Sequence, residues 1–160
     1  PTTGLRFFTV YGPWGRPDMA LFKFTKNIIN NKKIDLFNYG LHSRDFTYVD
    51  DVTTAIVKLI SKKKNLNNSK QKIPFRIFNI GNSKPVDLKK YLRFIEYFLG
   101  KKAKINKLPL QLGDIKNTLS NTKLLKKVIG RKKNTSVKEG VQKFINWYKS
   151  FYKVKQKYLR

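Results

Sequence analysis

The sequence lacks several features that would each point to a different class of protein. It contains no cysteine, which excludes a disulfide framework. No run of about 18 apolar residues is present, which excludes a membrane-spanning helix, and no basic segment leads into an apolar one as in a signal peptide. We therefore expect a soluble, cytoplasmic protein with no membrane partner. Its 160 residues, 40% of them hydrophobic, suffice for one domain with a core.

Acidic residues are also scarce, since nine aspartates and glutamates face 36 lysines and arginines, a formal net charge of +27. Such a charge on a small domain ordinarily suggests nucleic acid. The excess is mostly lysine, however, spread along the chain with many asparagines and isoleucines, as an AT-rich coding bias would produce on solvated faces. Phosphate-reading proteins more often concentrate arginine or exposed aromatics. We expect no nucleic-acid partner, and a basic nucleic-acid-binding module is the alternative from another class.

Strand-like and helix-like apolar patterns alternate along the chain, which predicts an α/β or α+β fold. Strands are predicted at residues 4–10, 34–37, 44–49, 75–81 and 103–110. Helices are predicted at residues 19–30, 87–99, 122–128 and 136–152, with a further helix after residue 50 or 51. Two helices have apolar residues at helical spacing that should face the core: Leu21, Phe24, Ile28 and Ile29 in one, and Val52, Ala55, Ile56, Leu59 and Ile60 in the other. Residues 62–72 are polar and are predicted to form a surface loop.

Capping residues mark the expected ends of these helices. Asp50 or Asp51 is expected to cap the second helix, so the two are interpreted as a cap and not as a metal pair. Gly100 should end the helix that precedes it. Ser136 and Glu139 have the spacing of a capping box.

Residues 7–24 place a Gly-x-x-Gly turn between a strand and a helix, roughly as in a dinucleotide-binding turn. A phosphate cradle needs small residues and free N–H groups where the helix starts. Pro13 and Pro17 each remove a donor, and Asp18 puts a carboxylate where the phosphate would lie. The glycines are therefore interpreted as a turn, and Asp18 as the N-cap of the helix.

The strand at residues 4–10 is apolar on both faces, which is typical of a buried strand. Such a strand needs neighbours on both sides, and no upstream residues supply them. We therefore expect the chain to be the second part of something larger.

A specific series of segments runs through the chain in order: RFFTVYGPWGRPDMALFKFTK, FNYG, RDFTYVDDV, FNIGN, LGD and EGVQKFINWY. The series resembles the C-terminal half of the extended short-chain dehydrogenase/reductase family and, within it, the UDP-glucuronate 4-epimerases. The resemblance covers residues 1–152, and residues 153–160 would form a basic tail. It implies an α/β fold, built from the last Rossmann strands and a small α+β substrate-binding lobe, with the N-terminal Rossmann core missing.

Members of that family bind NAD on an N-terminal Rossmann unit with a glycine-rich turn, and transfer protons with a Tyr-x-x-x-Lys pair. The only such spacing here joins Tyr97 to Lys101, and Gly100 should end the helix between them. The resemblance therefore implies no catalytic residue in this chain, a base upstream of Pro1, and NAD bound mainly by a partnering N-terminal Rossmann half. It also implies that the chain alone is inactive and that the complete enzyme can be a homodimer.

Thr9 and Arg16 match the residues that hold the glucuronate carboxylate in the resembled family. A guanidinium can grip a carboxylate through two charge-assisted hydrogen bonds, and a hydroxyl can add a third. In these enzymes NAD takes hydride from C4 of the sugar, and restraint of the carboxylate opposes loss of CO₂ from the resulting 4-keto uronic acid. Without the resemblance, a strand threonine and an exposed loop arginine would be the simpler interpretation. A UDP-glucuronate decarboxylase and a UDP-glucose 4-epimerase are the alternatives within the family.

The UDP half of the substrate is expected, by the same resemblance, at Phe37, Arg44 and Asp114. Phe37 would pack on the uracil, Arg44 would meet the diphosphate, and Asp114 would accept from the ribose hydroxyls. Ala20 and Leu21 would offer backbone groups to the nucleotide. A core phenylalanine, a surface arginine and a turn cap are the ordinary structural alternatives for the first three.

The remaining expectations concern the cofactor and the departures from the family pattern. Phe7 and Phe8 would border the nicotinamide ring. Gln111 stands where galactose-type relatives carry an arginine, and Asn121 stands where the family usually has an aspartate. His42, the only histidine, is expected to be exposed, and no metal site is predicted.

Overall fold

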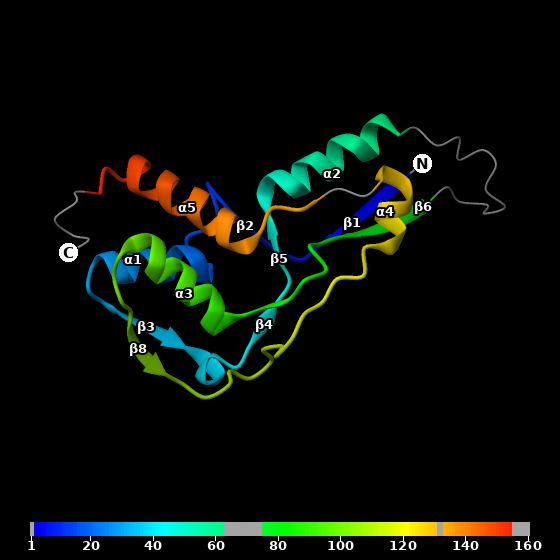
Figure 1. Cartoon of the computed structure of the whole chain (residues 1–160). Helices are drawn as coiled ribbons and strands as arrows, with labels where there is room; N and C mark the ends of the chain where they lie inside the picture. The colour runs from blue at the N-terminus through cyan, green and yellow to red at the C-terminus, as the bar shows by residue number, and fades with distance from the viewer. Residues whose placement is uncertain (1, 63–74, 131–132, 155–160) are drawn as a thin grey trace.

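The computed structural model describes residues 2–62, 75–130 and 133–154 (Figure 1). The helices are α1 (Ala20–Ile29), α2 (Val49–Ser61), α3 (Leu88–Leu99), α4 (Lys123–Ile129) and α5 (Val137–Phe151), with a 3-10 turn η1 (Phe37–Gly40). The strands are β1 (Thr2–Phe7), β2 (Thr9–Tyr11), β3 (Lys33–Leu36), β4 (Ser43–Arg44), β5 (Phe46–Tyr48), β6 (Phe75–Ile80), β7 (Val86–Asp87) and β8 (Lys104–Lys107).

The strands pair two by two, mostly in parallel. β1 pairs with β6, β2 with β5 and β3 with β8 in parallel, and β4 pairs with β7 in the antiparallel sense. Parallel pairs require crossover connections, which here contain the helices. This arrangement confirms the predicted α/β fold.

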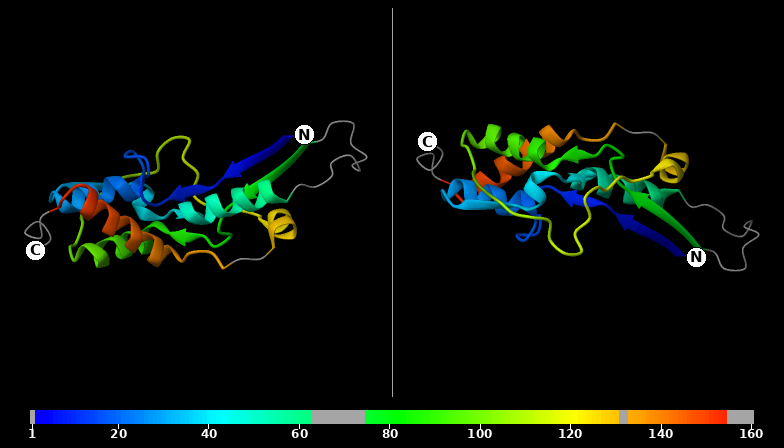
Figure 2. Two further views of the ribbon diagram at one scale, coloured as in Figure 1. Left: turned by 90° about the horizontal axis from the view of Figure 1, so that it is seen from above. Right: turned by 90° about the horizontal axis from the view of Figure 1, so that it is seen from below.

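The elements gather in two regions, each with its own core. Figures 1 and 2 show α1, α3 and α5 together with β3 and β8 at one end, and β1, β6, α2 and α4 at the other. In the first region Phe46 and Tyr91 stack with ring centroids 4.0 Å apart, and Tyr11 meets both rings edge-on. The second core is smaller and consists of Val52, Ala55, Leu59, Phe78, Ile80 and Leu125.

Several helix predictions are confirmed. The side chains of α1 that were expected in the core, from Leu21 to Ile29, are buried. Gly100 ends α3 in the left-handed conformation, with φ of 69°. Ser136 caps α5, since its side chain accepts from the backbone N–H of Glu139 at 3.2 Å.

Three local predictions are wrong. Asp18 does not cap α1, because the helix begins after Met19 and the Asp18 carboxylate is paired with a side chain two residues earlier. Asp50 and Asp51 lie inside the first turn of α2 and are not its N-cap. Their negative charges still interact favourably with the positive end of the helix dipole. Ile60 is 71% exposed, because it lies at the side of the buried face of α2, whose contact with the core at this end is made by Leu59.

The first predicted strand is also corrected. It divides at Phe8 into β1 and β2, and the side chains of β1 are exposed or half-buried. The reason is that β6 is the only strand beside β1 in the described part of the chain. The strand predicted at residues 44–49 likewise divides at Asp45 into β4 and β5. The predicted loop at 62–72 falls, apart from residue 62, outside the described residues.

Candidate functional site

A cleft of about 380 Å³ opens between the start of α1, β3, η1, β4 and the segment that contains Asp114. This volume is in the range of small-molecule sites. The cleft brings together five of the seven predicted substrate-binding residues, which come from distant parts of the sequence: Thr9, Ala20, Phe37, Arg44 and Asp114. Gln111, a departure from the family pattern, also lines it.

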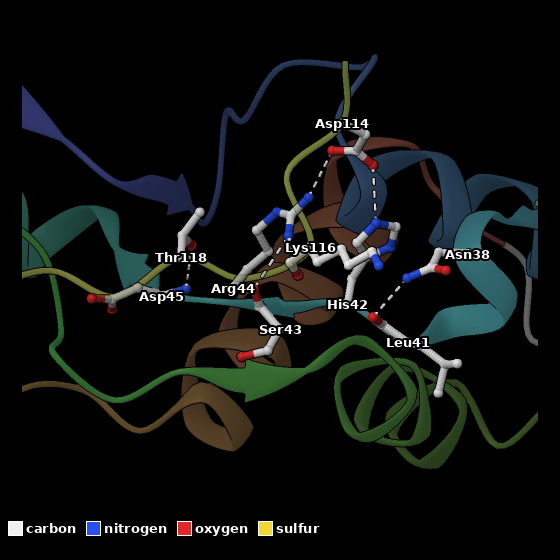
Figure 3. A network of polar contacts seen from close by, with 9 residues as sticks. All are labelled: Asn38, Leu41, His42, Ser43, Arg44, Asp45, Asp114, Lys116 and Thr118. Carbon is white, nitrogen blue, oxygen red and sulfur yellow. Dashed lines mark hydrogen bonds and ion pairs between the residues drawn. The ribbon is translucent and has the colours of Figure 1, made fainter. Parts of the chain in front are cut away.

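Arg44 and Asp114 form the polar centre of this cleft (Figure 3). Arg44 Nη2 donates to Asp114 Oδ1 at 2.8 Å, and Nη1 donates to the carbonyl oxygens of Lys116 at 2.9 Å and Ser43 at 3.2 Å. The guanidinium therefore fixes the 114–116 segment against β4. The side chains of Arg44 and Asp114 remain 19% and 33% exposed, so both are accessible from the cleft.

His42 also lies in this cleft, and its predicted exposure is wrong: the side chain is only 4% exposed. Its Nε2 lies 3.1 Å from Asp114 Oδ2. Two long-range contacts hold it there, because β4 pairs with β7 and the N–H of Leu88 donates to the His42 carbonyl at 2.9 Å. One signal could have found it, since residues two apart in an extended segment face the same way and Arg44 follows two positions later.

The other predicted substrate-binding residues differ in how deeply they are buried. Thr9 in β2 and Phe37 at the start of η1 are half-buried. Ala20 is the first residue of α1, so the helix N-terminus with its unpaired N–H groups borders the cleft. Leu21 is only 5% exposed and its side chain packs in the core, so its side chain does not line this cleft.

Arg16 does not line the main cleft. It borders a narrower cavity of about 40 Å³ that Thr9 also lines, so Thr9 lies between the two spaces. Arg16 donates through Nε to Asp18 Oδ1 at 3.0 Å and through Nη2 to Asp18 Oδ2. This pairing raises the pKa of Arg16 and lowers that of Asp18, first through the hydrogen bonds between them.

Phe7 and Phe8 do not line the cleft. Phe7 ends β1 and is 52% exposed. Phe8 is half-buried, and its N–H donates to the Ile80 carbonyl at 3.1 Å. An exposed ring is therefore present at the carboxyl end of a parallel strand, which is where ligands bind in open α/β sheets.

Asp45 is a structural residue that the sequence analysis missed. Its carboxylate is fully buried and accepts from the backbone N–H groups of Asn82 at 2.9 Å, Ser83 at 3.0 Å and Ser120 at 2.8 Å. These bonds tie the segments after β6 and before α4 to the junction of β4 and β5. Asp45 therefore holds the strand that presents Arg44.

Two other sequence observations are resolved by the structure. Tyr97 and Lys101 do not share a helix, because α3 ends at Leu99 and Gly100 is left-handed. Asn121, where the family usually has an aspartate, still accepts through Oδ1 from the N–H of Lys123 at 3.1 Å. It therefore supports the start of α4 as a carboxylate would.

The described residues contain no group of three or more histidine, cysteine, aspartate or glutamate side chains that could hold a metal ion. Among the same residues, no helix has the length and apolar character needed to cross a bilayer.

Comparison with known proteins shows the same relationship by sequence and by structure. Residues 1–81 match the model of the NAD dependent epimerase/dehydratase family. The chain is 52% identical to an uncharacterised protein of Escherichia coli, over 96% of this chain and 49% of that protein. It is 43% identical to a probable UDP-glucuronate 4-epimerase of Rhizobium meliloti, over 96% of this chain and 48% of that protein.

A solved structure gives a similar result. The fold is similar to that of a UDP-glucuronic acid 4-epimerase from Bacillus cereus in complex with UDP-glucuronic acid and NAD, with a TM-score of 0.79 and 29% identity over 92% of this chain and 45% of that one. The chain thus spans about half the length of the curated relatives it matches. This chain belongs to the NAD dependent epimerase/dehydratase family, and its fold is that of the C-terminal part of an extended short-chain dehydrogenase/reductase.

Proposed function

We propose that this chain is the substrate-binding part of an NAD-dependent UDP-glucuronate 4-epimerase, which in complete form is an isomerase that interconverts UDP-glucuronate and UDP-galacturonate. The observation that carries the proposal is the cleft that gathers Thr9, Ala20, Phe37, Arg44 and Asp114. The similarity to a probable UDP-glucuronate 4-epimerase and to the Bacillus cereus UDP-glucuronic acid 4-epimerase supports the choice of uronate.

The groups in the cleft suit the parts of a UDP-sugar. Phe37 offers an aromatic face for the uracil, and Asp114 offers acceptors for the ribose hydroxyls. Arg44 and the N-terminus of α1 at Ala20 both favour the diphosphate, the first by charge and the second by its unpaired N–H groups. Leu21 contributes through its backbone only, because its side chain is buried in the core.

The uronate carboxylate is assigned to Thr9 and Arg16. Thr9 lines both the main cleft and the narrower cavity beside Arg16, so a sugar that extends past Thr9 reaches the arginine loop. Two hydrogen bonds from the guanidinium and one from the hydroxyl would hold the carboxylate fixed while the sugar is a 4-keto species. A decarboxylase would use the same parts with a different carboxylate pose, and a UDP-glucose 4-epimerase would not need Arg16.

The residues present fit a nicotinamide cofactor at the edge of this chain. The ring of Phe7 is half exposed at the end of β1, next to the half-buried Phe8, and provides an apolar surface for a flat ring. NAD, when bound, would accept and return the hydride of the sugar C4. Its main binding surface and the catalytic base are assigned to an N-terminal Rossmann half, so this chain alone is inactive. We assign the complete enzyme to the cytoplasm as a homodimer.

Calorimetric titration of the chain with UDP-glucuronate tests the proposal. Arg44→Lys keeps the charge but loses the planar fork, so we expect its affinity to fall by about tenfold or more. Arg93→Lys is the matched control, since Arg93 is exposed on α3 and does not line the cleft. Absence of UDP-glucuronate binding by the wild type, or equal affinity in the two variants, would contradict the proposal.

One observation favours the alternative of a basic nucleic-acid-binding module. A second, open cleft of about 730 Å³ between α3, α4 and the start of α5 has no acidic residue among its described lining and is bordered by six lysines: Lys84, Lys90, Lys123, Lys126, Lys133 and Lys138. Duplex DNA titration at 0.2 M salt separates the two functions, because nonspecific binding falls steeply with salt. Saturable DNA affinity there, without UDP-glucuronate binding, would favour the module.

A further inference from the structure

The imidazole of His42 is a buried polar group that the proposed function does not use. It lies beside the carboxylate of Asp114, with Nε2 3.1 Å from Oδ2, while Arg44 Nη2 donates to Oδ1 at 2.8 Å. Figure 3 shows the two side chains reaching the carboxylate from the same stretch of chain, on either side of Ser43. The two oxygens of Asp114 are therefore each faced by a different donor.

This arrangement limits how the carboxylate can turn. An exposed aspartate can exchange between staggered rotamers unless its oxygens are held. An ionised carboxylate only accepts hydrogen bonds, so the contact favours the imidazole tautomer with hydrogen on Nε2. Nε2 is close to Oδ2, but the contact does not have the geometry of a hydrogen bond. Such contacts commonly tighten when a ligand binds.

Burial restricts the His42 side chain, as is needed if it is to hold the Asp114 carboxylate in one orientation. The side chain is 4% exposed, and its backbone is fixed on one side by the bond from the Leu88 N–H and on the other by the pairing of Ser43 with β7. Asp114, by contrast, is a third exposed and sits on a segment with no helix or strand. The more buried partner therefore orients the more exposed one.

We infer that His42 is a positioning residue that, with Arg44, holds the Asp114 carboxylate in the orientation that accepts from a ribose diol, and so sets the preference for ribonucleotides over 2′-deoxyribonucleotides. The inference rests on the proposed function, because it assumes a uridine nucleotide in the main cleft. It extends that function by naming a specificity-determining residue. A site built to hydrogen-bond a hydroxyl rejects the analogue that lacks it, since its polar groups are left unpaired.

The test compares binding of UDP and 2′-deoxy-UDP to the full chain by calorimetry. We expect the wild type to prefer UDP by about tenfold or more, as a hydrogen bond to a charged group is lost in the analogue. His42→Leu should weaken UDP binding more than 2′-deoxy-UDP binding, so that the preference falls to less than about twofold. His42→Gln keeps an N–H donor and should retain most of the preference.

A spectroscopic readout follows the contact itself. His42 is the only histidine, so its ring proton signals in NMR need no assignment. Addition of UDP should shift these signals in the wild type and leave them unmoved in Asp114→Asn, provided that thermal melts show the variant to be folded.

Different outcomes of these measurements bear on the proposed function and on the role of His42. Absence of UDP binding by the wild type overturns the proposed function, and the inference with it. Wild-type binding of UDP with no preference over 2′-deoxy-UDP, or a preference that His42→Leu leaves unchanged, overturns the inference and leaves the proposed function standing.

Discussion

The guanidinium of Arg16 and the carboxylate of Asp18 form an ion pair that joins Nε to Oδ1 and Nη2 to Oδ2. The pair lies on the loop before α1, and both side chains are more than half exposed. Asp18 thus occupies the guanidinium in the fork geometry that a substrate carboxylate would use. Because Arg16 is assigned to the uronate, the protein carries an internal competitor for its own substrate contact.

Replacement of Asp18 by asparagine should strengthen binding of UDP-glucuronate by a few-fold and that of UDP-glucose less, because the released guanidinium serves only the uronate carboxylate, whereas the loss of one negative charge acts on both anionic nucleotides. Calorimetry with the two sugars measures the difference. Asp35→Asn is the matched control, since Asp35 is another exposed carboxylate that lines the cleft. Equal strengthening for both sugars would contradict the competition.

Arg16→Ala should have the opposite effect to Asp18→Asn in the complete enzyme, since it should reduce the preference for the uronate substrate. We expect the uronate substrate to suffer far more than a neutral hexose, because only the uronate offers a carboxylate to the guanidinium. Steady-state kinetics with UDP-glucuronate and UDP-glucose give the comparison. An equal loss for both substrates would overturn the assignment of the carboxylate to Arg16.

Asp45→Asn should destabilise the fold by about 1–3 kcal/mol, since the amide nitrogen of asparagine would face N–H donors that now bind a carboxylate oxygen. The three bonds from Asn82, Ser83 and Ser120 all end on this buried side chain. Urea unfolding followed by circular dichroism measures the change. Asp50→Asn, an exposed substitution in the first turn of α2, should cost less than about 1 kcal/mol. Equal costs would show that the buried carboxylate does not tie these segments together.

The helices could be predicted because their signals are local. The apolar spacing from Leu21 to Ile29 and the glycine at residue 100 depend only on neighbours within a few turns, and both predictions are confirmed. Asp18 shows the limit of such reasoning. A carboxylate before a helix can accept from the backbone or from a nearby guanidinium, and composition does not decide which partner wins.

For a related reason, some residues of the candidate site could be predicted from the sequence and others could not. Arg44 and Asp114 could be named because quoted motifs carry them, and the structure brings them together across 70 positions. Asp45 lies in the same motif as Arg44, and His42 lies two positions before Arg44, but neither position reveals the role of its side chain. Their surroundings are created by pairing with β7 and by segments 37 to 75 positions away. Contacts of that range cannot be deduced from neighbouring residues.

Gly140→Ala should destabilise the protein by about 1–2 kcal/mol, although alanine ordinarily favours a helix by roughly 0.5–1 kcal/mol over glycine. The reason is that a methyl group at this position of α5 would collide with the ring and hydroxyl of Tyr11. Urea unfolding gives the difference. Gln142→Ala, on the exposed face of the same helix, should change stability by no more than about 0.5 kcal/mol. A stabilised Gly140→Ala variant would show that α5 can move away from β2.

Two buried tyrosines should make the fold sensitive to alkali. The hydroxyls of Tyr11 and Tyr91 have no hydrogen-bond partner in the described part of the chain, and burial raises the pKa of both, with the Asp51 charge adding to the effect at Tyr11. Their ordinary pKa is 10.0. Above that pH the unfolded chain loses these protons while the folded chain keeps them, so the unfolded state is favoured. Stability from this source is complete below pH 10 and is lost as pH rises further, by up to about 1.4 kcal/mol per pH unit for each hydroxyl.

The measurement is tyrosinate absorbance recorded together with circular dichroism from pH 9 to about pH 12. We expect the last part of the absorbance change to coincide with loss of helical signal, because these two tyrosines ionise only on unfolding. The double variant Tyr11→Phe with Tyr91→Phe should unfold at higher pH, and it should cost little at neutral pH because neither hydroxyl has a partner to lose. Tyr39→Phe, at a half-exposed ring, is the control and should leave the unfolding pH unchanged. Complete ionisation of all tyrosines while the helical signal is intact would mean that neither hydroxyl is sealed from solvent, and the packing of Tyr11 between β5, α3 and α5 would need revision.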